Sequence, residues 1–415
     1  MNTPKIRFKG FKDDWEQRKL GEIALQTYGG GTPKTANEEF WKGNIPWIQS
    51  SDLLEERLFN VKPRKYISQE AISKSSTKLV PQNSIAIVTR VGVGKLAFMP
   101  FSYATSQDFL SFSELKIEPE FAVYALYKMM RLVSNEVQGT SIKGITKDEL
   151  LAKEILIPDC EEQKKIGAYL HNLDHLITLH QRKCDETKQL KNFMLQKMFP
   201  KNGEKNPEIR FEGFTDDWEQ RKLKDMCSII TKQTGFDYTT TIKPSLVTKK
   251  EEDTYSFIQN KDFEGMNINL DTDFYIPISV AERYPKITLD QPSLLISISG
   301  RIGNVGLYSL QSKAFIGGAV GICKLNNIED GKTVLYELLS PFGQKYFSSL
   351  VKASSHANIT VEDIRNIEVL LPKSVKEECR INIFFEKLDH LITLHQRKCE
   401  KLKELKKYML QNMFV

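Results

Sequence analysis

The sequence predicts an α+β fold with a pseudo-twofold internal repeat, in which two globular α/β domains are separated by two long helices that form a coiled coil. Two duplications predict this arrangement. The segment LDHLITLHQRKC stands unchanged at residues 173–184 and 388–399, and IRFKGFKDDWEQRKL at residues 6–20 returns as IRFEGFTDDWEQRKL at residues 209–223. Between these segments the halves diverge. We therefore expect the repeated parts to share one task and the middles to differ in what they recognise.

The repeats divide the chain into six expected parts. Residues 1–20 form an N-terminal anchor, and residues 21–158 form the first globular domain. They are followed by a central long helix (159–200), a linker with the repeated anchor (201–223), the second globular domain (224–372) and a C-terminal long helix (373–415).

Within each globular domain, short runs rich in β-branched residues are separated by Gly, Pro, Asn and Ser, which is typical of strands joined by turns. In the first domain we predict strands at residues 45–49, 84–89, 109–117 and 155–157, and a helix at 120–137. In the second domain the sequence predicts strands at residues 293–299, 319–325 and 369–371, and one helix at 334–350.

Both long helices carry apolar or small polar residues at alternating steps of four and three, which is typical of a coiled-coil seam. A helix of about 39 residues would be nearly 60 Å long. The alternative is a long amphipathic helix that lies on a globular core. The predicted seam and docking residues are Ile166, Leu170, Leu173, Ile177, His180 and Cys184 in the first copy and Ile381, Phe385, Leu388, Ile392, His395 and Cys399 in the second.

The composition is that of a folded, soluble protein. Charged residues make up 27% and hydrophobic residues 40% of the 415 positions. There is no run of about 20 apolar residues and no signal-peptide core, so we expect a cytoplasmic protein. The six cysteines include no CxxC pair, which predicts reduced thiols. A net charge of +6 is compatible with nucleic-acid binding but not specific for it.

No catalytic motif is found. The run at residues 90–96 is not a phosphate-binding P-loop, because Thr89 replaces the first glycine and Leu96 stands where Ser or Thr would bind Mg²⁺. The dinucleotide, amino-methyltransferase, GxSxG and HExxH signatures are missing too. His180/Cys184 and His395/Cys399 could form a zinc site between antiparallel helices. We instead interpret them as polar seam residues that set the helix register, and predict no metal.

Each half contains a hydrophobic strand that leads into a loop of glycines, hydroxyl groups and one arginine: IVTRVGVGK at 87–95 and ISGRIGN at 298–304. Arginine can bind guanine or phosphate through two hydrogen bonds, and glycine lets a backbone approach DNA closely. The alternative is a β-turn with an exposed arginine. With neighbouring polar loops, the candidate DNA-binding residues are Thr32, Lys34, Gln49, Ser50, Ser51, Thr89, Arg90, Lys95 and Lys143 in the first half, and Gln259, Asn260, Lys261, Ser299, Arg301, Asn304, His356 and Asn358 in the second.

This arrangement resembles the specificity subunit of a Type I restriction–modification system. The two anchors, the duplicated helices and the strand–proline–helix segments EILIPDCEEQKKI (154–166) and EVLLPKSVKEECRI (368–381) carry the likeness, which covers essentially the whole chain. The Glu162-Gln163 pair is typical of the family. We take Glu378-Cys379 as its counterpart in the second half, where it departs from the pattern.

The resemblance implies two target recognition domains, each reading one half of a bipartite, asymmetric site in double-stranded DNA. It also implies that the helices form an antiparallel coiled coil that sets the spacing of the half-sites and docks the modification subunits, expected to be two. Those partners would bring S-adenosylmethionine, and restriction subunits would add ATP- and Mg²⁺-dependent cleavage, so this chain would bind no cofactor and catalyse nothing. Two alternatives stay open: a self-contained DNA-modifying enzyme of unfamiliar type, and a coiled-coil assembly scaffold with no DNA role.

Overall fold

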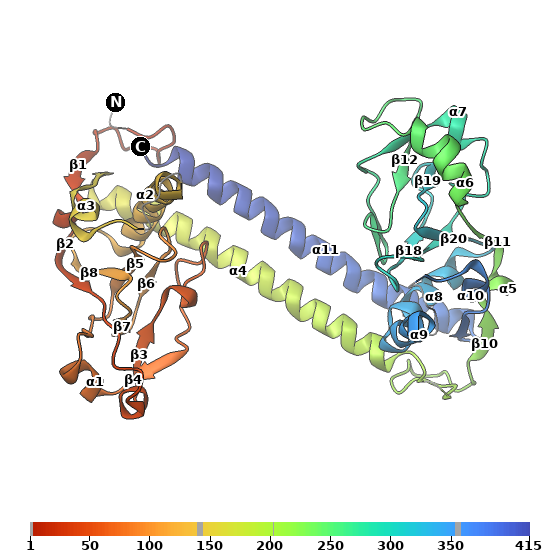
Figure 1. The fold of residues 1–415 in the computed structure, drawn as a ribbon, viewed down its shortest axis with the longest axis horizontal. Helices are drawn as coiled ribbons and strands as arrows, with labels where there is room; N and C mark the ends of the chain where they lie inside the picture. Colours follow the sequence, from red (N-terminus) through yellow and green to blue (C-terminus); the bar gives the residue numbers. More distant parts are fainter. Residues whose placement is uncertain (1–2, 139–143, 202, 353–357) are drawn as a thin grey trace. The chain divides into compact units, whose positions relative to one another are not determined.

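The computed structural model describes residues 3–138, 144–201, 203–352 and 358–415, and the chain divides into two compact units. Unit 1 comprises residues 1–180 and 397–415, and unit 2 comprises residues 181–396. Each unit contains one globular domain together with a part of each long helix (Figure 1). No helix of the described ranges is both long and apolar enough to cross a membrane.

Unit 1 is built around a four-stranded antiparallel sheet in the order β2 (Ala24–Gly29), β8 (Phe109–Leu115), β5 (Ser84–Val88), β6 (Leu96–Met99). Side chains of β5 alternate between two cores: Ile85 and Ile87 pack with helix α2 (Pro119–Gln138), and Ala86 and Val88 face the other side. Further elements are β1 (Glu16–Lys19) paired with β9 (Glu154–Ile157), the sheet β4 (Lys65–Ile67), β3 (Ile45–Ile48), β7 (Ala104–Thr105), and helices α1 (Gln69–Lys74) and α3 (Lys147–Ala152).

Unit 2 repeats this plan. Its four-stranded antiparallel sheet has the order β11 (Cys227–Lys232), β20 (Val320–Leu325), β17 (Ser293–Ser297), β18 (Val305–Tyr308), and β10 (Glu219–Lys222) pairs with β21 (Glu368–Leu371) as β1 pairs with β9. A mixed sheet holds β15 (Tyr275–Pro277), β12 (Thr254–Ile258), β19 (Ala314–Ile316) and β16 (Thr288–Leu289). Shorter elements are α5 (Leu223–Met226), α6 (Gly235–Asp237), β13 (Phe263–Glu264), β14 (Asn267–Ile268), α7 (Ile278–Ala281) and α10 (Val361–Arg365).

One helix prediction is wrong. The sequence predicts a single helix at residues 334–350, but unit 2 has two, α8 (Ile328–Leu339) and α9 (Pro341–Lys352). Ser340 has extended backbone angles, φ −63° and ψ 160°, and Pro341 follows it. Proline disfavours the helical conformation in the residue before it and lacks the amide proton, so the helix ends here and a new one starts. Unit 1 has no proline at this point, and α2 continues as one helix.

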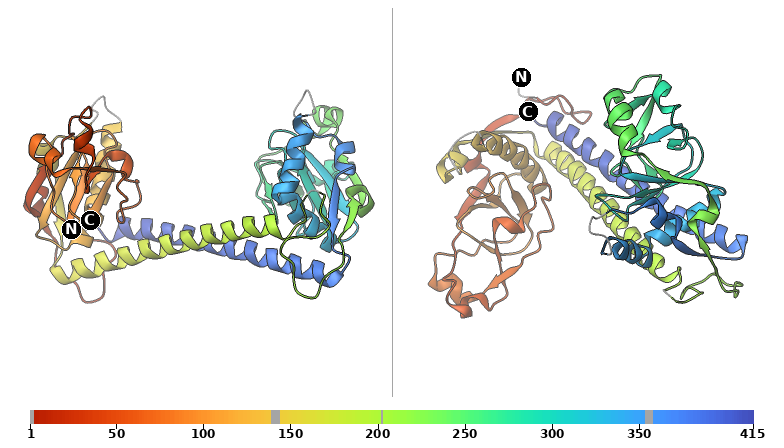
Figure 2. Two further views of the ribbon diagram at one scale, coloured as in Figure 1. Left: turned by 90° about the horizontal axis from the view of Figure 1, so that it is seen from below. Right: turned by 45° about the vertical axis from the view of Figure 1, so that its right-hand side comes forward.

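Both expected long helices are present: α4 (Cys160–Lys197) and α11 (Val375–Asn412). A proline precedes each, Pro158 and Pro372. The Asp159 Oδ1 atom accepts hydrogen bonds from the amides of Glu161 (2.9 Å) and Glu162 (3.0 Å), which satisfies donors that the first turn of α4 leaves free. In each unit, part of α4 and part of α11 run side by side in opposite directions (Figure 2).

The predicted seam residues divide into two groups. The first three of each copy lie in hydrophobic clusters with the globular domain and the end of the other helix, as the alternative of a helix on a globular core predicts. The later residues meet the other helix: the Cys184 Sγ atom lies 4.0 Å from Ile392 O, and the Cys399 Sγ atom lies 3.9 Å from Ile177 O. Buried seam residues are Ile166, Leu170, Leu173, Cys184, Ile381, Phe385, Leu388 and Cys399, and Ile177, His180, Ile392 and His395 are half-buried.

A buried ion pair explains why the anchor is repeated. The Glu162 carboxylate accepts hydrogen bonds from Arg7 Nε (2.8 Å), Arg7 Nη2 (2.7 Å) and Trp15 Nε1 (3.2 Å). In unit 2, Glu377 accepts the same three bonds from Arg210 Nε (2.6 Å), Arg210 Nη2 (2.8 Å) and Trp218 Nε1 (3.4 Å). The arginine and tryptophan of each anchor thus fasten it to the first turns of a long helix.

This geometry corrects the family pair assigned to the second half. The counterpart of Glu162 is Glu377, so Glu378 rather than Cys379 corresponds to Gln163. Gln163 accepts a hydrogen bond from the Glu118 amide (2.9 Å). Burial raises the pKa of Glu378, which accepts a hydrogen bond from Thr333 Oγ1 (3.0 Å).

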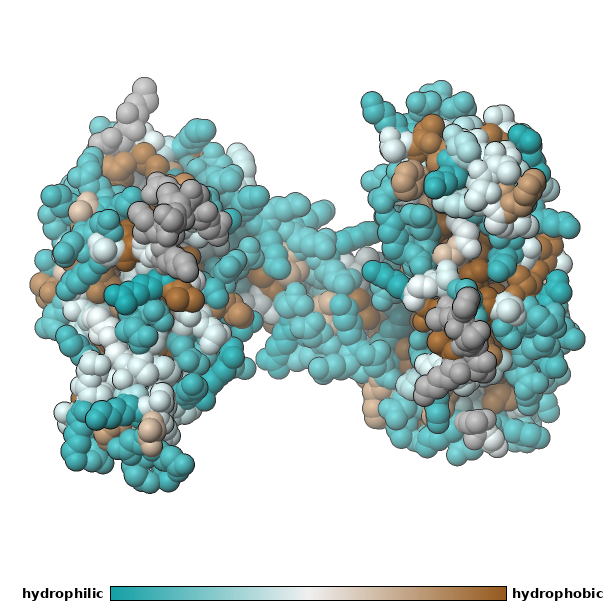
Figure 3. Space-filling model, viewed as in Figure 1, coloured by the Kyte–Doolittle hydropathy of each residue, from teal (hydrophilic) through white to brown (hydrophobic). Residues whose placement is uncertain are grey.

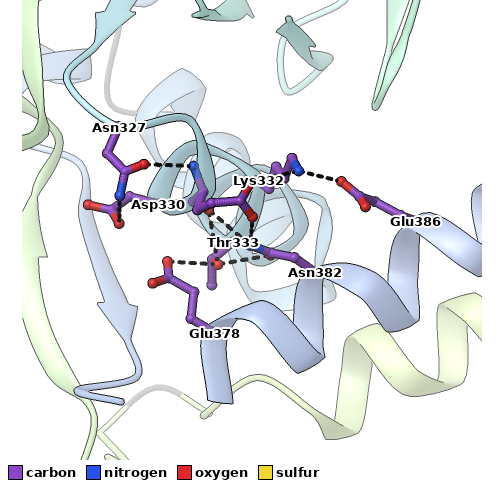
Figure 4. A network of polar contacts seen from close by, with 8 residues as sticks. Asn327, Asp330, Lys332, Thr333, Glu378, Asn382 and Glu386 are labelled. Carbon is purple, nitrogen blue, oxygen red and sulfur yellow. Dashed lines mark hydrogen bonds and ion pairs between the residues drawn. The ribbon is translucent and has the colours of Figure 1, made fainter. Parts of the chain in front are cut away.

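Glu378 belongs to a polar network between α8 and α11 (Figure 4). Asn382 donates to Glu329 O (3.0 Å), and Lys332 bridges the carboxylates of Glu329 and Glu386, each at 2.8 Å. At the position that corresponds to Asn382, unit 1 has Gly167, where an added Cβ would lie 2.8 Å from the Phe121 amide nitrogen. The two domains therefore use different contacts to reach the same helix face.

Glu377→Ala is expected to lower the free energy of unfolding by about 2–4 kcal/mol, because Arg210 and Trp218 lose a buried acceptor. Denaturant-induced unfolding followed by circular dichroism measures this change. Glu219→Ala is the matched control, since its ion pair with Arg221 is exposed and should contribute less than about 1 kcal/mol. Equal, small losses in both variants would contradict the role of the buried pair.

Candidate nucleic-acid interface

Three loops of unit 1 meet at one end of its central sheet. The Ile145 amide donates to Thr89 O (2.8 Å). This bond joins the segment that leads into α3 to the loop that follows β5. A Cβ atom added to Gly144 would lie 2.8 Å from Thr89 O. A Cβ added to Gly92 would lie 3.8 Å from the Ser50 Cβ, so the turn after β3 lies beside the same loop.

The arginine-bearing loop needs its glycines. Gly92 and Gly94 have φ values of +92° and +101°, which side chains rarely adopt. A Cβ on Gly94 would lie 3.0 Å from the Ser134 Cβ of α2, so the loop packs closely on that helix. Arg90 is left exposed at the edge of this loop.

Unit 2 builds the same three-loop site with other contacts. The Asn304 amide group donates to Asn260 O (2.9 Å) and Phe263 O (2.7 Å), and Asn260 Nδ2 donates to Ser299 O (3.1 Å). The Ile359 amide donates to Ile298 O (2.9 Å), as the Ile145 amide does to Thr89 O. The loop of residues 299–304 is therefore held between the turn after β12 and the segment that leads into α10.

The turns after β3 and β12 share one internal contact. The Gln49 amide donates to Asp52 Oδ2 (2.9 Å), and the Gln259 amide donates to Asp262 Oδ2 (2.8 Å). Burial raises the pKa of Asp262, and its bond to the Gln259 amide opposes that shift. Because the backbone of the turn is fixed by an aspartate, the side chains at its tip can differ between the halves.

The candidate residues fall into three groups by exposure. Those with exposed side chains are Thr32, Lys34, Ser51, Arg90, Lys261, Arg301 and Asn358. Half-buried ones are Gln49, Ser50, Lys95, Gln259, Asn260, Ser299 and Asn304, and Thr89 is buried. Lys143 and His356 lie outside the described residues.

Several candidates already have partners within the protein. Thr89 Oγ1 donates to Asp108 O (3.1 Å), and Thr32 Oγ1 donates to Gln107 Oε1 (2.6 Å). Lys261 forms an ion pair with Asp273. Asn304 uses its amide hydrogens to hold the loop. In contrast, neither Arg90 nor Arg301 has a carboxylate partner among the residues that the structure describes.

A concave surface adjoins Arg90. A pocket of about 580 Å³ is lined by residues that include Thr89, Arg90, Gln107, Asp108 and Lys147. It combines two cationic side chains with hydrogen-bond acceptors, and backbone groups of Gly29 and Gly144 complete it. Such a mixture can bind base edges and phosphate.

Sequence reasoning missed Arg64. Its Nη2 atom donates to Ser51 O (2.9 Å), and its Nε atom lies 3.2 Å from the Asp52 carboxylate. The side chain is 64% exposed, so a cation is present beside the tip of this turn. In unit 2 the turn carries its own cation, Lys261. The basic run KPRK at residues 62–65 was the available signal.

The outer faces of the long helices carry exposed apolar side chains at repeated positions. Leu176, Leu190 and Phe193 of α4 correspond to Leu391, Leu405 and Tyr408 of α11, and all are more than a third exposed. We call the residues of unit 1 helix patch 1 (Leu176, Leu405, Tyr408) and those of unit 2 helix patch 2 (Leu391, Leu190, Phe193). Figure 3 shows that the visible surface of both units is mostly hydrophilic, with smaller apolar areas.

The cysteine–histidine pairs do not gather into a cluster. No group of three or more His, Cys, Asp or Glu side chains in the described ranges is placed to hold a metal ion. The Cys184 and Cys399 thiols instead lie against backbone carbonyls of the opposite helix.

The sequence of this chain matches the model of a known protein family. The model of the Type I restriction modification DNA specificity domain matches the chain twice, at residues 12–189 and 215–404. The Type I restriction enzyme MjaIX specificity subunit of Methanocaldococcus jannaschii is 28% identical over 238 residues, 52% of this chain and 52% of that protein. This match thus spans about half the length of the relative.

Two further similarities extend over the whole chain. The MjaVIII specificity subunit of the same organism is 23% identical, over 95% of this chain and 91% of the relative. The crystal structure of a Type-I restriction-modification system S subunit from M. genitalium shares the fold, with a TM-score of 0.66 and 15% identity over 100% of this chain and 99% of that one. The chain belongs to the family of the Type I restriction modification DNA specificity domain, of which it carries two copies.

Proposed function

We propose that this chain is the non-catalytic, sequence-reading subunit of a Type I restriction–modification complex, and that each globular domain reads one half of a bipartite DNA site. The observation that carries the proposal is one loop framework built twice with different side chains at its tips. Arg90 and Arg301 lie in equivalent loops of the two units. In the neighbouring turn, however, Ser50 and Ser51 of unit 1 are replaced by Asn260 and Lys261 in unit 2. Different donors and acceptors favour different base edges, so the two half-sites differ in sequence.

The long helices dock the partners. Helix patches 1 and 2 consist of matching residues, so two copies of one modification subunit can bind in equivalent ways. Exposed apolar groups at repeated positions favour protein contacts over solvent. The modification subunits supply S-adenosylmethionine and methylate adenine, restriction subunits supply ATP- and Mg²⁺-dependent cleavage, and the complex works on DNA in the cytoplasm.

Mapping of genome methylation with and without this chain tests the proposal. We expect one gapped, asymmetric sequence to lose its adenine methylation when the chain is deleted. If the purified chain alone methylates or cleaves DNA with S-adenosylmethionine and Mg²⁺, it is a self-contained enzyme. If its deletion changes no methylated sequence and it binds no DNA, a scaffold role replaces the proposal.

Arg90→Ala and Arg301→Ala are each expected to weaken specific binding by about 1–3 kcal/mol, because one bidentate contact to a base or phosphate is lost. Each variant should relax selectivity in its own half-site only. Binding of the complex to duplexes with single base changes, at one fixed salt concentration, measures both effects.

Arg18→Ala and Arg221→Ala are the matched controls for these variants. Both arginines are partly exposed and pair with a nearby glutamate on the small sheets, away from the three loops. The controls should bind as the unaltered chain does. Full affinity and full selectivity in Arg90→Ala and Arg301→Ala would remove the arginine loops from the reading surface.

An insertion of four residues after Lys183 and after Lys398, equivalent positions of α4 and α11, is expected to lengthen each helix by about 6 Å. Because DNA rises about 3.4 Å per base pair, the preferred gap should grow by one or two base pairs. Sequencing of methylated DNA measures the gap. The same insertion in the exposed segment 248–253 should leave it unchanged. A methylating variant with the original gap would contradict the spacer role.

A further inference from the structure

Where each globular domain meets the two long helices, a tyrosine, an aspartate and a lysine form a largely buried three-way contact. In unit 1, Tyr124 Oη donates to Asp174 Oδ2 (2.6 Å) and Lys406 Nζ donates to Asp174 Oδ1 (2.5 Å). The Lys406 ammonium also lies 5.5 Å from the centre of the Tyr124 ring. Tyr124 is fully buried, and only 9% of the Lys406 side chain is exposed.

Unit 2 contains the same contact with the helices exchanged. Tyr336 Oη donates to Asp389 Oδ2 (3.0 Å), and Lys191 Nζ donates to Asp389 Oδ1 (2.5 Å). Lys191 lies 5.4 Å from the centre of the Tyr336 ring. We call the two sets the positioning triads: Tyr124–Asp174–Lys406 and Tyr336–Asp389–Lys191.

Each triad ties three separate elements together. The tyrosine comes from the domain helix (α2 or α8), the aspartate from the long helix that begins beside that domain, and the lysine from the end of the other long helix. Burial and the negative aspartate raise the pKa of both tyrosines, so each stays a neutral donor. A buried lysine without its carboxylate would be costly, which makes the contact sensitive to position.

The spacing of the triads is the same on both helices. Lys191 follows Asp174 on α4 by 191 − 174 = 17 residues, and Lys406 follows Asp389 on α11 by 406 − 389 = 17 residues. In an antiparallel pair, equal spacing lets both lysines reach their aspartates in one register. A slip of one heptad would move each lysine about 10 Å away from its partner.

The apolar seam alone does not select this register. Its residues recur every seven positions, so a slip of one heptad still places apolar groups opposite one another. Polar contacts distinguish registers because a buried charge tolerates no apolar neighbour in place of its partner. The triads therefore provide what the hydrophobic seam lacks.

We propose that the two positioning triads set the gap that the complex accepts between its half-sites, by fixing the helix register and the attachment of each domain to it. This inference rests on the proposed function, since it assigns residues to the spacer role. The triads lie between the domain helices and the long helices, so the effect we assign to them is one of positioning. They stand apart from the arginine loops that read the half-sites.

Two variants test the proposal. The first, Lys191→Met with Lys406→Met, removes both charges and retains long, flexible side chains. The second, the apolar variant, also replaces Asp174 and Asp389 by Leu and Tyr124 and Tyr336 by Phe. Replacing a buried ion pair by packed apolar residues often preserves or raises stability, so the second variant separates stability from register.

Each variant is purified with its modification subunits and given duplexes whose gap is the natural one or is changed by one to three base pairs. We expect the ratio of methylation rates, natural gap to altered gap, to fall at least about tenfold in both variants, or ~1.4 kcal/mol. Base changes within a half-site should still abolish methylation. Lys188→Met with Lys403→Met, equivalent and exposed on the same helices, should keep the original ratio.

Two results would overturn the proposal. If the triads only stabilise the fold, the apolar variant regains both stability and the natural gap preference, and the proposal is overturned. An unchanged ratio in the double-lysine variant overturns it as well. A failure of the proposed function looks different, because the unaltered complex would then methylate no gapped sequence at all.

Discussion

Each globular unit depends on the end of a long helix that begins beside the other domain. In unit 1, the Phe414 ring lies 5.4 Å from Phe121 and 6.2 Å from Trp15, between centroids. In unit 2, Phe199 lies 5.8 Å from Phe385 and 6.0 Å from Trp218. A buried aromatic ring contributes about 2–3 kcal/mol by area alone. The helix ends are thus parts of the two cores, so the long helices and the domains fold as one system.

This dependence explains which parts of the sequence are repeated. The anchor supplies the tryptophan and arginine that close the core over the helix end, so it recurs nearly unchanged. The arginine-bearing loops and the turns beside them share contacts that hold their backbone, such as the hydrogen bonds that the Asp52 and Asp262 carboxylates accept from backbone amides. Their side chains can change without loss of the core. In the proposed function, divergent tips on a repeated frame are the physical basis for reading two different half-sites.

Much of this fold follows from periodicity, because repeats and heptads are local patterns. The long helices, the central strands and the position of the arginine loops were predictable in this way. Three features were not. The break at Pro341 required weighing one proline against a helical pattern. The pairing of Glu377 with Arg210 joins residues far apart in sequence, and that of Arg64 with Asp52 depends on how the chain turns between β3 and β4. Candidates such as Asn304 were found as polar loop residues, but only geometry assigns their amide groups to the backbone.

The proposed spacer role assigns a second task to the identical segment LDHLITLHQRKC. Its apolar residues hold the helices in the cores, as any amphipathic helix would. Its aspartate does something else, because Asp174 and Asp389 each accept from a domain tyrosine and from a lysine of the opposite helix. Hydrophobic burial is insensitive to direction, whereas a paired buried charge is specific for one geometry. In the proposed spacer role, stability and spacing are therefore carried by different atoms of the same repeated helix.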